Sequence, residues 1–221
     1  METSEAFPDD PRSAELAAAA IEGDDARVRE LVGLGANPNA HGDRDVTPLQ
    51  VALLAGSGEG MRALLDAGAD PDLPGLGGTT AMHMAAIADD PALLRLLLDH
   101  GGDPNARHGL TRATPLAAAA GPRTDAQFRM LLDAGADPAL ADRTGNTALH
   151  AAAMINAGEH VLLLLERGAD PNARNGQDAT FQPYFFRTAD AALSDDARAR
   201  REAVVAWLRA HRVPLEAAVG P

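Results

Sequence analysis

Residues 47–71 read TPLQVALLAGSGEGMRALLDAGADP, and both ends of this stretch recur along the chain. The first motif recurs as TPLQ at Thr47, TAMH at Thr80, TPLA at Thr114 and TALH at Thr147. The second, Gly-Ala-Asp/Asn-Pro, begins at Gly35, Gly68, Gly135 and Gly168, with the variant GGDP at Gly101. In the four complete units the threonine precedes the glycine by 21 residues, and the units step by 33 or 34. Two motifs kept in phase indicate an internal repeat.

Each motif has a physical role. The threonine is predicted to cap a helix N-terminus, and a proline such as Pro48 fits the next position because its missing N–H is not needed there. The glycine ends a second helix in the left-handed conformation, and the Asp-Pro pair starts a loop. Leucines and alanines between the motifs face inward. One unit is therefore helix, turn, helix and projecting loop, and it buries its apolar face only by stacking.

These motifs resemble the ankyrin repeat, with proline where that family usually has valine after Gly-Ala-Asp. The resemblance implies an all-α solenoid of about six repeats that binds other proteins. We expect a disordered acidic tail at 1–12, with Ser13 as the first helix cap, followed by a single domain at 13–221. The expected repeats are 13–42, 43–75, 76–109, 110–142, 143–175 and 176–221.

The last repeat departs from the pattern. If Trp207-Leu208 are aligned with the paired leucines of other repeats and His211 with the glycine, ten extra residues lie near 181–196. This segment holds four of the seven aromatic residues, Phe181, Tyr184, Phe185 and Phe186. They are interpreted either as a cover for the end of the core or as an anchor for a partner, and the first is favoured because solenoid ends need covering.

Composition restricts the function. The formal net charge of −13 argues against nucleic acid and anionic membranes as partners. The negative charge fits a basic protein partner, and it fits equally well a surface charge that only keeps the protein soluble. The chain has no cysteine, which excludes disulfides and thiolate chemistry. The N-terminus does not read as a secretory signal, and the apolar run Leu16–Ile21 is too short to span a bilayer. We expect a cytoplasmic monomer.

The polar residues do not form a recognisable catalytic or metal-binding motif. His83 and His150 occupy the fourth position of TAMH and TALH, where the ankyrin resemblance implies a structural hydrogen bond to the loop backbone. Paired acids such as Asp24-Asp25 fit helix starts. The Gly75–Gly78 segment lacks the lysine of a phosphate loop. The prediction is a protein that is not an enzyme and uses no cofactor or metal.

The resemblance implies that partners bind the concave side, on loop tips and first helices. The expected partner-binding residues in the loops are Asp43, Arg44, Val46, Leu76, Thr79, Leu110, Thr111, Arg112, Arg143, Thr144 and Asn146. The first helices add Leu54, Ile87, Met154 and Ile155 near their C-terminal ends. These aliphatic residues are interpreted either as an exposed contact strip or as packing under the next loop. By residue type, Arg112 and Arg143 are the favoured hot spots.

The favoured function is therefore reversible binding of a partner protein, with inhibition of that partner as in an immunity or regulatory protein. The motif composition looks like that of bacterial stand-alone ankyrin proteins, a group that includes immunity proteins and host-directed effectors. A second hypothesis is an effector or adaptor that links two proteins. A third, from another class, is a ligand-binding or enzymatic module with a pocket under 181–196.

Overall fold

The computed structural model describes residues 3–216, and all regular structure in this range is helical. The chain forms two compact units, residues 1–110 and 111–221. In the first unit the helices are α1 (Thr3–Ala6), α2 (Pro11–Glu22), α3 (Asp25–Gly33), α4 (Pro48–Leu54), α5 (Gly58–Asp66), α6 (Ala81–Ala86) and α7 (Pro91–Asp99). Two 3-10 turns, η1 (Asp43–Asp45) and η2 (Leu76–Gly78), lie in its loops.

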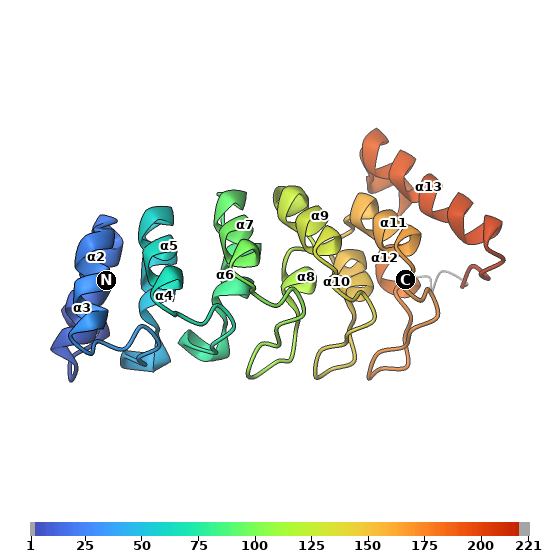
Figure 1. Ribbon diagram of the computed structural model, residues 1–221. Helices are drawn as coiled ribbons and strands as arrows, with labels where there is room; N and C mark the ends of the chain where they lie inside the picture. Colours follow the sequence, from blue (N-terminus) through green and yellow to red (C-terminus); the bar gives the residue numbers. More distant parts are fainter. Residues whose placement is uncertain (1–2, 217–221) are drawn as a thin grey trace. The chain divides into compact units, whose positions relative to one another are not determined.

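The second unit holds α8 (Pro115–Ala118), α9 (Asp125–Asp133), α10 (Ala148–Met154), α11 (Gly158–Glu166), α12 (Gln182–Phe185) and α13 (Asp195–Ala210). Its 3-10 turns are η3 (Pro122–Thr124) and η4 (Asp190–Ala192). Within each unit, helix pairs stand side by side and long loops project beyond them (Figure 1). The single domain expected over 13–221 stays a prediction, since compact units within a repeat array need not be separate domains. The contacts of a repeat array are local, so no single core needs to run through the whole chain.

The helix caps agree with the repeat motifs. The hydroxyls of Thr47, Thr80 and Thr114 accept hydrogen bonds from backbone N–H groups in the first turn of α4, α6 and α8. The glycine that follows the second helix is left-handed in the complete repeats, for example at Gly68 with φ of 93°. Leu49, Leu64 and Met82 are fully buried, as the stacking requires. The prediction of an all-α solenoid of stacked helix pairs is confirmed.

The N-terminus differs from the prediction of a disordered tail over 1–12. Residues 3–6 form α1, and Ala6 and Phe7 are buried against Ala17 and Val51. Helix α2 begins at Pro11, and Asp10 rather than Ser13 caps it by accepting the Ser13 N–H at 3.1 Å. Residues 3–12 are ordered because Phe7 packs into an apolar cluster with Ala17 of α2 and with Val46 and Val51 of the second repeat.

The last repeat also differs in register. The N–H of Val213 donates to Leu208 O, as Ala69 N–H donates to Leu64 O in an earlier repeat. Arg212, with φ of 56°, therefore takes the place of the left-handed glycine, one residue after the predicted His211. Leu208 accordingly aligns with the first leucine of the pair. The sequence pattern failed here because no glycine marks this turn.

Candidate protein-interaction surface

The loops that project from the helix pairs are held by their own backbones. In the second repeat the Gly42 N–H donates to Val46 O at 2.8 Å, and in the third the Gly75 N–H donates to Thr79 O at 2.8 Å. The same bond joins Asp142 to Asn146 at 2.8 Å in the second unit. Each loop is thus closed into a narrow hairpin-like tip by a main-chain bond across its base.

Neighbouring loops are also joined to one another within each unit. The Gly109 N–H donates to Gly78 O at 2.7 Å in the first unit. In the second, Arg143 N–H donates to Thr111 O and Gly176 N–H donates to Thr144 O, both at 2.8 Å. Within each unit, these main-chain bonds join neighbouring tips into a row, at residues 78 and 109 in the first unit and at residues 111, 143–144 and 176 in the second. The row presents side chains at a fixed spacing, which a binding surface requires.

In each unit, a side chain of a first helix also bonds to the loop of the following repeat. The Gln50 side chain donates to Thr79 O at 2.6 Å and accepts the Leu76 N–H at 2.9 Å. His150 takes this place in the second unit, with its Nε2 3.1 Å from Ala179 O. Burial lowers the pKa of His150 below the usual histidine value, so the ring is neutral at pH 7. The structural role predicted for His150 is confirmed.

Most of the residues expected to bind a partner are accessible. Asp43, Arg44, Leu110, Thr111, Arg112, Arg143 and Thr144 are exposed, and Leu76, Thr79 and Asn146 are half-buried. Val46 is the exception. Only 1% of it is accessible, and it packs with Phe7 and Ala6 in the N-terminal cluster. Its assignment to the partner-binding surface is wrong, because the ordered N-terminus covers it.

The aliphatic residues near the ends of the first helices are exposed and do not pack under the next loop. Leu54 and Ile87 are 58% and 60% accessible in the first unit. In the second unit Met154 and Ile155 are also exposed. The sequence analysis missed Ile21, which is 36% accessible and lies seven residues after Ala14, as Leu54 lies seven after Thr47. Counting from the missing threonine of the first repeat would have found it.

The aromatic residues of segment 181–196 do not all serve the same purpose: some cover the core and others are partly exposed. Phe181 and Phe185 are buried, so they cover the end of the core. Tyr184 accepts a hydrogen bond from the Asn175 side chain at 2.8 Å, which fixes it to the preceding loop. Phe186 is only half-buried, and the Arg201 guanidinium lies 5.7 Å from its ring centroid. Capping is therefore the role of the two buried rings.

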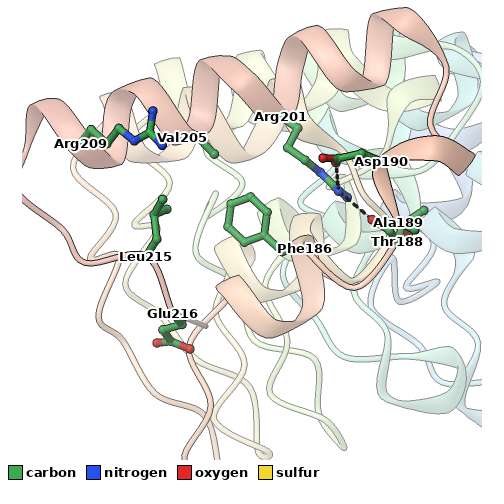
Figure 2. A pocket seen from close by; sticks show the side chains of 9 residues that line it. All are labelled: Phe186, Thr188, Ala189, Asp190, Arg201, Val205, Arg209, Leu215 and Glu216. Atoms are coloured by element: carbon green, nitrogen blue, oxygen red, sulfur yellow. Dashed lines mark hydrogen bonds and ion pairs between the residues drawn. The ribbon is translucent and has the colours of Figure 1, made fainter. Parts of the chain in front are cut away.

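A cavity of about 410 Å³ lies between this segment and α13. Figure 2 shows the Phe186 ring directed into it, with Val205 and Arg209 on α13 above and Leu215 at one side. Arg201 is fixed at the far wall, where it donates to Asp190 and to Thr188 O, each at 2.7 Å. The lining combines apolar walls with charges that are largely paired, and it brings no serine or histidine into the cavity. A pocket therefore lies where the third hypothesis requires one, but its lining does not resemble a hydrolytic site.

A second polar group in the same unit joins α9 to α11. His160 is buried and stacks on Phe128 with ring centroids 3.9 Å apart, and its Nε2 lies 3.1 Å from Asp125 Oδ1. Burial lowers the pKa of His160, while hydrogen bonds from Arg129 and His160 lower that of Asp125. A neutral ring packed flat on phenylalanine fits a structural contact between helices. No cluster of residues in the range 3–216 has the ligands for a metal ion.

The comparison with protein families decides the classification. The model for ankyrin repeats matches residues 16–108 and 103–175, which is well over half of the chain. The chain belongs to the ankyrin-repeat family. Ankyrin repeats generally act as protein-interaction modules rather than enzymes. In the described part of the chain, no helix is both long and apolar enough to cross a membrane.

Solved ankyrin structures are similar over most of the chain. The ankyrin repeat domain of Bcl-3, described as a unique member of the IkappaB protein family, superposes with a TM-score of 0.73 at 27% identity, over 88% of this chain and 85% of that one. The ankyrin repeat protein EF0377 gives a TM-score of 0.67 at 26% identity, over 78% of this chain and 90% of that one.

A curated protein is similar over a shorter range. Protein PhlB of Serratia liquefaciens is 44% identical over 29% of this chain. The matched region spans 35% of the length of PhlB, so the likeness concerns a part of each protein.

Proposed function

We propose that this ankyrin-repeat protein binds a partner protein through its loop tips and the exposed ends of its first helices. The observation that carries the proposal is the row of loops joined by main-chain hydrogen bonds. Such a row holds exposed side chains such as Leu110 and Arg143 without using them for the fold. Side chains free of a structural role are available for recognition.

We further propose that the partner carries a basic surface and that binding inhibits it, as in an immunity or regulatory protein. The net charge of −13 supports the charge of the partner, because opposite fields accelerate association and disfavour acidic competitors. An adaptor that links two proteins is the alternative. The binding stoichiometry separates a one-partner inhibitor from a scaffold.

The test uses the full chain as bait in a lysate of its own source. The loop-tip variant Leu110→Ala/Arg143→Ala removes one exposed aliphatic and one arginine from the loops. The control, Leu34→Ala/Arg95→Ala, removes the same two residue types from exposed positions on or directly after second helices, away from the loop tips. We expect a basic protein to be retained by the wild type and the control and lost from the loop-tip variant.

Calorimetry with the recovered protein then gives affinity and stoichiometry, and an assay of that protein's own activity tests inhibition. Equal retention by all three baits would overturn the proposed surface. Recovery of an acidic partner would overturn the charge argument while leaving the surface in place. A partner whose activity is unchanged by saturating amounts of the chain would exclude inhibition.

A further inference from the structure

An aliphatic strip runs across three successive repeats of the first unit. Ile21, Leu54 and Ile87 occupy the same register, each 33 residues after the last, and all three are exposed. They lie at or next to the C-terminal ends of α2, α4 and α6. Helix α2 packs on α4 and α4 packs on α6, so the three helix ends are neighbours. We call Ile21, Leu54 and Ile87 the aliphatic strip.

Acidic residues border the strip. Glu22 follows Ile21 directly, Asp89 lies two residues after Ile87, and both are exposed. Glu59 reaches back toward the preceding repeat, because a Cβ added at Gly23 would meet its Oε2 at 3.0 Å. The ion pairs of this unit use other acids, namely Glu15, Asp25, Glu30, Asp43 and Asp66. Glu22, Glu59 and Asp89 therefore face solvent beside an apolar surface.

The helix ends add to this negative field. The C-terminus of an α-helix carries a partial negative charge from its last carbonyl groups. The first helices of successive repeats all start at their loops, so their C-terminal ends lie together at the strip. The charge of the whole unit has the same sign, since residues 1–110 hold 19 acidic residues and 7 arginines. Residues 111–221 hold 13 and 12, so the excess negative charge belongs almost entirely to the first unit.

We infer that the aliphatic strip receives a basic amphipathic helix of a partner protein, a proposal that rests on the proposed function and specifies its partner. Packed helices lie about 8–10 Å apart, and each contributes one residue to the strip. Successive aliphatic side chains of the strip are therefore spaced by about this distance. An α-helix rises about 10.5 Å in seven residues, so apolar residues seven apart match that interval. Lysine or arginine residues flanking that apolar face would meet the carboxylates of Glu22, Glu59 and Asp89.

The direct test uses a fluorescent peptide of about 20 residues with leucines at the a and d positions of each heptad and lysines on the flanks. A peptide of the same composition, with its leucines redistributed so that no apolar face forms, is the control for charge alone. Fluorescence anisotropy with the full-length chain is expected to show tighter binding of the amphipathic peptide. Binding of it should weaken as salt rises.

The variant Ile21→Ser/Leu54→Ser/Ile87→Ser should bind the amphipathic peptide at least about tenfold more weakly, since three apolar contacts are lost. Leu34→Ser is the matched control, because Leu34 is 62% accessible in the same unit but lies outside the strip. All substituted positions are exposed, and thermal unfolding checks that the variants remain folded. Unchanged affinity of the triple variant, or equal affinity for both peptides, would overturn the inference.

A second pair of variants tests the contribution of the acidic residues that border the strip. Glu22→Gln/Glu59→Gln/Asp89→Asn should weaken binding and reduce its salt dependence more than Glu5→Gln/Asp9→Asn/Asp99→Asn, which removes the same charge elsewhere in the unit. Equal effects of the two sets would overturn the assignment of the basic flanks to this border.

The strip variant also serves as bait in the lysate experiment. Loss of the recovered partner from both the strip and loop-tip variants supports the inference. A partner lost from the loop-tip variant but retained by the strip variant would overturn the inference and leave the proposed function standing. A partner retained by both variants would overturn the two together.

Discussion

At the scale of single residues, neighbouring loops are joined by the side chain at one repeat position, which is an asparagine in one repeat and an aspartate in the next. The amide of Asn39 donates to Gly68 O and accepts the Asp70 N–H, at 2.9 and 2.7 Å. One repeat later Asp72 accepts the Asp103 N–H but, as a carboxylate, has no proton to donate. Burial, together with the charges of Asp103 and Asp70, raises the pKa of Asp72 to about 6.

This pKa predicts the effect of Asp72→Asn. The folded state holds the Asp72 proton more tightly than the unfolded state, so its contribution to stability is present below about pH 4 and is lost as pH rises through 6. At pH 7.5 the variant should be more stable by about 1 kcal/mol after allowance for solvent screening, because it removes the buried charge and can donate to the next loop. The gain should shrink toward pH 4.

Chemical denaturation at pH 4 and 7.5 measures this difference. Asp170→Asn is the control, since Asp170 is an exposed aspartate whose bond, to the Asn172 N–H at 2.8 Å, stays within its own loop. A gain of equal size at both pH values would contradict the proposed cause, as would the same gain in the control.

At the scale of elements, successive repeats meet where a turn of one lies on a helix end of another. The Ser57 hydroxyl donates to Ala20 O at 2.8 Å, which joins the α4–α5 turn to the end of α2. Gly60, buried in α5, lies so close to the same carbonyl that an added Cβ would overlap it. Glycine at this position permits a close approach between two repeats. It is required because a side chain would not fit, and not because the backbone adopts a positive φ.

Gly60→Ala should therefore destabilise the first unit by about 2–3 kcal/mol, because α5 must move away from α2. Gly58→Ala, two residues earlier in the same helix, should be neutral or slightly stabilising, since its nearest neighbour would be Leu93 Cδ2 at 3.7 Å. Thermal unfolding of both variants provides the measurement. Equal stability of the two would show that α5 can shift at no cost.

Some features of the helices and loops could be predicted from the sequence, and others could not. The threonine caps and glycine ends were predictable because each depends on bonds within one turn. The burial of Val46 was not, since it depends on Phe7, about forty residues away in the sequence. Exposed aliphatics such as Leu54 could be proposed from register alone, but only the packing of the next repeat shows that nothing in their own unit covers them. The cavity beside Phe186 has no counterpart in the repeat motif.

At the scale of the whole molecule, the two units differ in charge rather than in fold. The first holds 19 acids against 7 arginines and the second 13 against 12. Repulsion between like charges opposes compactness, and salt screens it. Raising NaCl from low to moderate concentration should therefore slow amide hydrogen exchange in the helices of residues 3–110 more than in those of 111–216.

Hydrogen exchange with mass spectrometry of the intact chain measures both units in one sample, so the second unit is an internal reference. Repeating the measurement near pH 4, where many carboxylates are protonated, should remove most of the difference. Equal slowing in both units at neutral pH would show that the charge imbalance does not affect stability.

The main-chain bonds between neighbouring loops have a consequence for how such a protein can change. A mutation at an exposed tip position that is not a glycine, such as Leu110 or Arg143, alters what the protein recognises without breaking the bonds that align one tip with the next. New specificities can therefore accumulate at such positions on a frame that stays folded, and a laboratory library randomised there should yield mostly folded members.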